Sequence, residues 1–217
     1  MLGLRGVRLG VTMPEIYVAQ ARAIFLATMA ARANGHAISP EMMLPLVSAR
    51  REVELIKTDI DAVAAAVRTE TGADFSYRVG VMVETPRAAF RADEIVQHCM
   101  FLSFGTNDLT QMTYGLSRDD AGRFMGIYVQ KGVFAEDPFH ALDEGGVGEL
   151  LTIGAARGRS VRPDVTLSIC GEHGGDPASI AFCRKAGFDY VSCSPFRVPV
   201  ARLAAAHLAL TDPKPAV

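Results

Sequence analysis

Short runs of almost continuously apolar residues alternate along this chain with longer stretches of helical periodicity, and this alternation limits the fold more than any other feature. Five runs have strand character: residues 42–47, 77–83, 101–104, 166–170 and 190–193. Stretches with apolar residues at helical spacing follow each run and also precede the first. Strands that are apolar on both faces must be covered on both sides, so the sequence predicts a parallel α/β sheet.

The positions of polar residues distinguish the two common forms of such a sheet, the barrel and the doubly wound sheet. Glu84, residues 105–108, Cys170 and Ser194 all come just after predicted strands. In a barrel the carboxyl ends of the strands converge on one mouth, where such residues meet. We therefore expect a (β/α)8 TIM-barrel type fold, of which this chain forms the C-terminal part with about five of the eight strands.

Composition and charge exclude several classes of protein. The 217 residues include 22 Lys+Arg and 24 Asp+Glu, a net charge of −2 that gives no sign of a nucleic-acid-binding surface. No apolar run approaches the ~18 residues of a membrane span, and the first residues lack the order of a signal peptide. We expect one soluble, cytoplasmic domain over residues 1–217, with its four cysteines as free thiols.

Glu84 and Asp108 are candidate metal ligands. Glu84 follows one predicted strand and Asp108 follows the next, so a parallel sheet would place the two carboxylates side by side. Oxygen ligands of this kind suit Mg²⁺ or Mn²⁺, which keep other coordination positions for water and substrate. Acidic residues also cap helices, and the spacing alone is compatible with that role for both.

The small residues between these two acids indicate an anion site. Gly105, Thr106 and Asn107 lead into a predicted helix, where backbone N–H groups and an amide side chain can hold phosphate oxygens. The same residues are common in ordinary turns. Arg5, Arg8 and Arg118 are candidate clamps for phosphate or carboxylate, because a guanidinium group can bind such anions bidentately. A solvated surface position is the alternative for each arginine.

Cys170 lies between a predicted strand and a glycine-rich segment, so its thiol is expected near the mouth of the barrel. A thiol with the reference pKa of ~8.5 is mostly protonated at neutral pH, and Cys170 could therefore donate a proton as well as act as a nucleophile. A zinc site on Cys170 and His173 lacks a second pair of ligands at the usual spacing. Cys183 and Cys193 fall within helical and strand patterns and are interpreted as packing residues.

Five motifs in a fixed order resemble a known family. They are MLGLRG at 1–6, MVETPR at 82–87, SFGTNDLTQ at 103–111, CGEHGGD at 170–176 and YVSCSP at 190–195. With them the chain resembles the phosphoenolpyruvate (PEP)-utilising enzymes over nearly its whole length, and most closely the C-terminal PEP/pyruvate-binding domain of the pyruvate, phosphate dikinases. PEP synthase and the sugar-transport phosphotransferase enzyme I share the Glu and Asn-Asp elements but look less similar around residues 173 and 192–197.

The resemblance implies a (β/α)8 barrel that binds PEP or pyruvate, with Mg²⁺ held by Glu84 and Asp108. It also implies that Cys170 is the catalytic acid that protonates the enolate carbon. The residues that it implies at the substrate are Arg5, Glu84, Gly105, Thr106, Asn107, Asp108 and Arg118, with the two arginines at the anionic end. These roles agree with the chemistry expected from the residue types alone.

The implied reaction is Mg²⁺-dependent phosphoryl transfer between a phosphohistidine and pyruvate or enolpyruvate. In the full-length enzymes a swivelling domain carries the phosphohistidine and another domain binds ATP, and together they convert ATP, phosphate and pyruvate into AMP, pyrophosphate and PEP. Neither domain is in this chain, which therefore looks like a fragment that does not complete the cycle alone. The family also implies a homodimer through this domain.

Two other functions stay open from the sequence. A PEP synthase or a relative of enzyme I would share the same substrate residues, and dependence on phosphate would separate a dikinase from a synthase. The other alternative is a non-catalytic module, a barrel remnant that serves only dimerisation. Titration with Mg²⁺ and PEP distinguishes that module from an enzyme.

Overall fold

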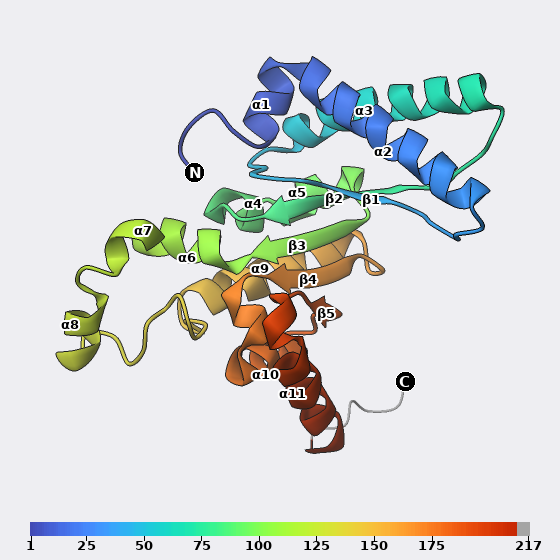
Figure 1. The fold of residues 1–217 in the computed structure, drawn as a ribbon. Helices are drawn as coiled ribbons and strands as arrows, with labels where there is room; N and C mark the ends of the chain where they lie inside the picture. The colour runs from blue at the N-terminus through green and yellow to red at the C-terminus, as the bar shows by residue number, and fades with distance from the viewer. Residues whose placement is uncertain (212–217) are drawn as a thin grey trace.

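The computed structural model of the protein describes residues 1–211, within which five strands form a single parallel sheet (Figure 1). The strands are β1 (Glu41–Leu44), β2 (Arg78–Val83), β3 (Phe101–Gly105), β4 (Thr166–Cys170) and β5 (Tyr190–Val191). Their order across the sheet is the same as along the chain. A doubly wound sheet reverses its order partway, whereas the wall of a (β/α) barrel does not. The predicted barrel-type fold with five strands is therefore confirmed, as an open wall with β1 and β5 at its edges.

Helices connect the strands in the order expected for β/α units. The α-helices are α1 (Val7–Thr12), α2 (Pro14–Ala33), α3 (Arg50–Thr71), α4 (Pro86–Phe90), α5 (Ala92–Ile95), α6 (Thr106–Tyr114), α7 (Arg118–Ala121), α8 (Met125–Gln130), α9 (Val147–Val161), α10 (Pro177–Lys185) and α11 (Val198–Thr211). Short 3-10 helices are η1 (Val96–His98), η2 (Glu172–Gly175) and η3 (Pro195–Arg197). Figure 1 shows α2 and α3 packed together at one end of the sheet and α10 and α11 together at the other.

Two elements differ from the sequence-based expectation. The sequence predicts one helix over residues 86–99, but α4 ends at Phe90, and Arg91, with φ −118° and ψ 26°, separates it from α5. Both short helices pack on α9, and the break lets each follow its surface. Residues 106–108 are predicted as a turn ahead of a helix, yet they already form the first turn of α6. The following insertion is predicted to be rich in loops, and it holds the short helices α7 and α8.

The hydrophobic core lies between the sheet and the helices that cover it. Alternate side chains of the three central strands are at most 2% exposed: Val79, Val81, Val83, Leu102, Phe104, Leu167 and Ile169. On α3 the spacing predicts one apolar face, and four of its residues, Val53, Ile56, Ile60 and Val67, are buried, whereas the fifth, Val63, is only partly buried. Burial on this scale is the main force that holds the strand ends in a fixed register.

Polar contacts between strands lie at the amino-terminal ends of the strands. Arg78 of β2 pairs with Glu41 of β1 and donates to Thr166 Oγ1 of β4 at 3.0 Å. The Arg78 guanidinium also lies 5.5 Å from the ring centre of Phe101 on β3. The Arg78 side chain therefore connects β1, β2, β3 and β4 at their amino-terminal ends. The candidate site predicted from the sequence lies at the opposite, carboxyl-terminal ends.

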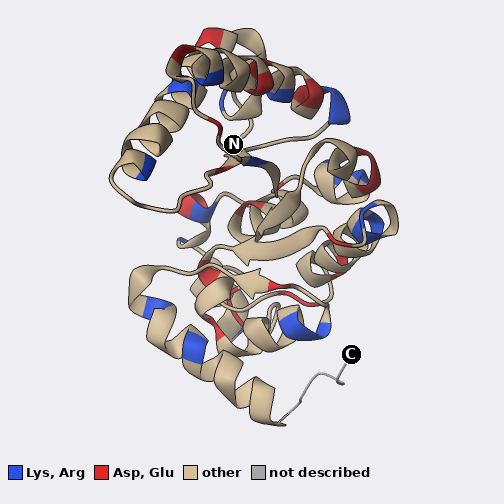
Figure 2. Ribbon diagram, turned by 90° about the vertical axis from the view of Figure 1, so that its right-hand side faces the viewer, with Lys and Arg blue, Asp and Glu red and all other residues tan. Residues whose placement is uncertain are grey.

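Charged residues lie mostly on the outer helices and loops, as Figure 2 shows for one side of the molecule. In the part of the chain that the structure describes, no helix combines the length and the apolar character that crossing a membrane would need.

Candidate active site at the carboxyl ends of the strands

The carboxyl ends of β2, β3 and β4 lie next to one another, and the segments that follow them form the candidate active site. The register places Val83 opposite Phe104, and Gly105 opposite Cys170. Three segments therefore lie side by side at the carboxyl-terminal end of the sheet. They are Glu84, the start of α6 and the segment after β4. The structure thus brings together the motifs that the sequence leaves scattered over about ninety residues.

Glu84 and Asp108 are in hydrogen-bond contact. Glu84 is 7% exposed, and its Oε1 accepts a hydrogen bond from the Leu46 N–H at 2.6 Å. Burial, with the hydrogen bond and the charge of Asp108, raises the pKa of Glu84 to about 8, while the Leu46 N–H and the Arg5 charge act in the opposite direction. Two carboxyl groups this close do not both ionise readily, so the pair retains a proton near neutral pH.

The contacts of the two acids also test the alternative that they only cap helices. Thr85, rather than Glu84, caps α4, because its Oγ1 accepts from the Ala88 N–H at 3.2 Å. Asp108 lies in the first turn of α6, where an acidic residue is favoured by the helix dipole. Helix capping therefore does not explain the buried position of Glu84.

The pair has the donor chemistry of a divalent-cation site. A hard cation takes carboxylate oxygens and relieves the repulsion that otherwise retains a proton. The backbone allows the close approach, since a Cβ at Gly105 would lie 2.9 Å from the Glu84 Cβ. Among residues 1–211 no group of three or more His, Cys, Asp or Glu side chains comes together. Water and substrate would have to supply the other ligands of an ion such as Mg²⁺.

The Cys170 thiol lies beside this pair and is half-buried. Its Sγ is 3.4 Å from the Met82 Sδ, and it is also in hydrogen-bond contact with Ser103. Burial raises the pKa of the Cys170 thiol, the Ser103 contact lowers it, and the charges of Glu84 and Asp108 raise it further. The thiol is therefore protonated at neutral pH, which suits a proton donor better than a nucleophile.

The start of α6 packs against the segment that follows β4. Thr106 Oγ1 lies 3.0 Å from the Cys170 carbonyl oxygen, and Asn107 Oδ1 accepts from the Glu172 N–H at 3.3 Å. Gly171 has φ 121°, and a Cβ there would lie 2.7 Å from Thr106 Oγ1, so this contact requires glycine. Because Oδ1 of Asn107 is engaged, its amide N–H groups are the part of the side chain that can donate to an anion.

Arg118 is held near the site through Gln111. The Arg118 backbone N–H donates to Gln111 Oε1, and Gln111 Nε2 donates to Asp108 Oδ1, both at 2.9 Å. The Arg118 guanidinium lies 3.5 Å from Glu172 Oε1 and is half-exposed. It therefore stands at the rim of the site, where an incoming anion can compete with Glu172.

Arg5 lies in the exposed N-terminal segment, close enough to Glu84 for its charge to lower the carboxyl pKa. Arg8 shapes that segment, because its guanidinium donates to the carbonyl oxygens of Met1 at 2.8 Å and Gly3 at 2.9 Å. Arg5 is thus the arginine of this segment that faces the acidic pair.

The sequence did not predict the roles of four residues that shape the site. Leu46 acts through its backbone, with φ 57°, and is the one non-glycine residue with positive φ in the described part of the chain. No sequence signal reveals it. Ser103 stands out as a polar residue in a buried strand, and this could have indicated its contact with Cys170. Gln111 and His173 show their roles only through the contacts that they make.

His173 is fully buried in η2 and uses both ring nitrogens. Nδ1 lies 2.7 Å from Thr106 Oγ1, and Nε2 lies 3.0 Å from the Pro138 carbonyl oxygen. The ring is therefore committed to hydrogen bonds, which argues against the zinc site considered from its spacing to Cys170. All four cysteines are free, as predicted, and burial raises the pKa of Cys99 and of Cys183 to about 12.

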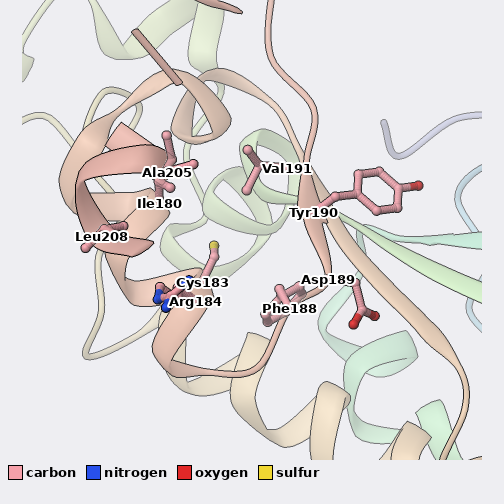
Figure 3. Close-up of a pocket in the computed structure, with 9 residues that line it drawn as sticks. All are labelled: Ile180, Cys183, Arg184, Phe188, Asp189, Tyr190, Val191, Ala205 and Leu208. Carbon is pink, nitrogen blue, oxygen red and sulfur yellow. The ribbon is translucent and has the colours of Figure 1, made fainter. Parts of the chain in front are cut away.

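A small cavity of about 160 Å³ lies elsewhere, between α10, β5 and α11 (Figure 3). None of the candidate active-site residues lines it. It is a gap in the packing of the last two helices, α10 and α11, against the edge strand β5, and it is separate from the candidate active site. Its lining residues are Ile180, Cys183, Arg184, Phe188, Asp189, Tyr190, Val191, Ala205 and Leu208.

Known proteins match the chain over almost all of its length. Residues 1–210 match the family model described as PEP-utilising enzyme, PEP-binding domain. The chain is 58% identical over 208 residues to a pyruvate, phosphate dikinase of Rhizobium meliloti (strain 1021), and 51% identical over 213 residues to one of Clostridium symbiosum. The alignments cover 95% and 98% of this chain but 23% and 24% of those proteins. The chain therefore spans about a quarter of the length of these relatives.

A solved structure supports the fold independently. A citrate lyase from Burkholderia xenovorans LB400 superposes with a TM-score of 0.53 at 19% identity, covering 76% of this chain and 48% of the other. At that identity the likeness concerns the fold alone, which is of the TIM-barrel type. With the family match over residues 1–210, these findings show that the chain belongs to the PEP-utilising enzymes, as their PEP-binding domain.

Proposed function

We propose that this chain is the PEP/pyruvate half-site of a pyruvate, phosphate dikinase, an enzyme that transfers a phosphoryl group between a phosphohistidine domain and pyruvate. The observation that carries the proposal is the hydrogen-bonded pair of Glu84 and Asp108 beside the protonated thiol of Cys170. The names of the relatives favour the dikinase over PEP synthase and enzyme I. The same pair favours a catalytic domain over a module that serves only association.

Binding of the anionic substrate falls to the start of α6 and to the arginines. The first N–H groups of α6 and the Asn107 amide can donate to phosphate oxygens, with Gly105 and Thr106 forming the backbone of that turn. Arg5 and Arg118 add positive charge at the rim, which favours a dianion over neutral ligands. Glu84 and Asp108 would hold Mg²⁺, which when bound neutralises charge on the substrate oxygens during transfer.

Cys170 would move the proton at carbon 3 of the substrate. In the direction of pyruvate, the S–H bond breaks, a C–H bond forms at the enolate carbon, and the electron pair stays on sulfur as a thiolate. In the opposite direction the thiolate removes a methyl proton of pyruvate. Burial supports this role because it keeps the thiol protonated at neutral pH.

The experiment that tests the proposal uses this chain and a chimeric dikinase. In the chimera the 217 residues replace the matching segment of the Rhizobium meliloti protein. Calorimetry with Mg²⁺ and PEP should show binding to the chimera, and the chimera should convert pyruvate into PEP when ATP and phosphate are supplied. Absence of PEP binding would overturn the proposal. Dependence on phosphate separates a dikinase from a PEP synthase only in the full-length enzyme of which this chain is a part, because the ATP-binding domain of the chimera comes from a dikinase.

Self-association is part of the same proposal. The edge strands β1 and β5 each leave one side unpaired in the described residues, and several large apolar side chains nearby are exposed, including Phe196 at 94% and Leu203 at 72%. Such edges and apolar surfaces favour contact with another chain. A homodimer and a cytoplasmic location stay predictions.

A further inference from the structure

His173 connects two segments that are far apart in the sequence. Its Nδ1 contacts Thr106, the first residue of α6, and its Nε2 contacts Pro138, which lies between α8 and α9. Residues 115–146, called the insertion below, hold α7 and α8 and carry Arg118. The ring is thus one of the polar links between the start of α6 and the insertion.

The partners of the ring fix its protonation state. A proline carbonyl can only accept a hydrogen bond, so Nε2 must carry the proton. Burial lowers the pKa of His173, against the opposing effects of the Pro138 and Ala141 backbone and of the Asp176 and Glu172 charges. The ring is therefore neutral near pH 7, and Nδ1 is left as an acceptor.

A neutral ring of this tautomer decides where the Thr106 hydroxyl points. Thr106 Oγ1 has one proton and two acceptors within reach, His173 Nδ1 at 2.7 Å and the Cys170 carbonyl oxygen at 3.0 Å. Since Nδ1 carries no proton, only the Thr106 hydroxyl can supply that hydrogen bond. The ring therefore fixes one rotamer at the start of α6, directly before Asn107.

The insertion has a few other polar attachments: the Arg118 guanidinium lies 3.5 Å from Glu172 Oε1, the Leu142 N–H donates to Ser179 Oγ at 3.2 Å, and Asp143 is hydrogen-bonded to Tyr114. Ala121, Met125 and Phe139 form a small buried cluster of their own, separate from the main core. Phe139 follows Pro138 directly, so the hydrogen bond from His173 reaches the edge of that cluster. At its start the insertion is tied to Asp108 through the Gln111 bridge described above. These two polar contacts and the Arg118–Glu172 ion pair together set where Arg118 lies relative to α6.

We propose that His173 is a positioning residue: as the Nε2–H tautomer it locks the insertion onto the start of α6, and so sets the affinity of the site for its anionic substrate. The identity of that substrate rests on the proposed function. The hydrogen-bond relay from Pro138 through His173 to Thr106 does not.

Two variants test the two hydrogen bonds of His173 separately. His173→Gln retains a donor near the place of Nε2 and can still reach Pro138, whereas His173→Asn retains only a polar group near the place of Nδ1. His140→Gln is the matched control, because His140 is an exposed histidine of the same insertion. Far-ultraviolet circular dichroism identifies any variant that fails to fold.

The tautomer of His173 and the attachment of the insertion to α6 are both measured without substrate. In the ¹⁵N-histidine-labelled chain, long-range ¹H–¹⁵N NMR should show one ring with a protonated Nε2 and a bare Nδ1, and His173→Gln should remove that signal. Amide exchange across residues 115–146 should accelerate at least about tenfold in His173→Asn and much less in His173→Gln. A cationic ring, an Nδ1–H tautomer, or equal exchange in both variants would overturn the proposal.

Kinetics in the chimera test the positioning role. His173→Asn should raise KM for PEP about tenfold with kcat within about twofold, His173→Gln should restore most of the loss, and His140→Gln should match the parent. A fall in kcat at unchanged KM would overturn the role in affinity. If the parent chimera itself binds no PEP, the proposed function fails, and the NMR and exchange results still decide the relay.

Discussion

Glu84 and Asp108 form a hydrogen-bonded carboxyl pair at the carboxyl ends of the central strands, and the pair lies within electrostatic reach of the Cys170 thiol. Its position follows from the parallel register of β2 and β3, which brings the segments after the two strands to the same carboxyl-terminal end of the sheet. A pair that holds one proton is a site that a cation can occupy by displacing that proton. Metal, proton and substrate chemistry can therefore meet in one small region of this domain.

The first prediction concerns stability without metal. The pKa of Glu84 is about 8 in the folded protein and near the ordinary 4.5 in the unfolded chain. The folded state therefore binds more protons between these values, and the stability that this proton contributes is lost as the pH rises through about 8. Urea unfolding in chelator, followed by circular dichroism, should show a falling midpoint from pH 6 to 9. Asp108→Asn should flatten that fall, and an unchanged pH profile would contradict the coupling.

The second prediction concerns the cation. Mn²⁺ should bind the chain with release of a proton, and Glu84→Gln or Asp108→Asn should each remove most of the binding. The double variant should lose little more Mn²⁺ binding than the single variant with the greater loss, because the two groups act on one ion. Paramagnetic resonance counts bound Mn²⁺, and Glu15→Gln, an exposed acid on α2, serves as the control. Additive losses would mean that the two carboxylates have separate roles.

The third prediction concerns Cys170. In the chimera, Cys170→Ala should still bind PEP with Mg²⁺, but exchange of the pyruvate methyl protons with solvent should fall by ~10²–10⁴-fold. Proton NMR in heavy water measures this exchange. Cys193→Ala should exchange like the parent, because no contact of Cys193 with the acidic pair is found in the described residues. Normal exchange in Cys170→Ala would leave the residue with a packing role only.

The fourth prediction concerns the turn after β4. Gly171→Ala should lower the free energy of unfolding by about 1–3 kcal/mol, since the residue has φ 121° and the new Cβ would lie 2.7 Å from Thr106 Oγ1. Gly122→Ala is the matched control, because nothing lies within 4 Å of a Cβ there and the backbone is helical. Urea unfolding compares the two. Equal stability of both variants would show that the turn adjusts without strain.

The last prediction concerns association. The unpaired edges of β1 and β5 and the exposed side chains of Phe196 and Leu203 should make the chain self-associate at micromolar concentration. Light scattering with size-exclusion chromatography measures the mass. A well-behaved monomer would show that these surfaces stay open in solution.

The sequence by itself determined the order and type of the main elements. Apolar runs and helical spacing are local patterns, and they place the five strands and most helices within a few residues of their observed ends. Polar residues directly after strands also reveal the edge at which the site forms, because every parallel strand brings its carboxyl end to that edge.

Only the tertiary structure decided how those residues act. The Leu46 N–H that binds Glu84 lies 38 residues away from it, and the Thr106 hydroxyl that meets His173 lies 67 residues from the ring. Such contacts depend on strand register and on close packing, which local residue patterns do not encode. The raised pKa of Glu84 and the fixed tautomer of His173 arise from burial among these distant partners, so they exist only once the chain has folded.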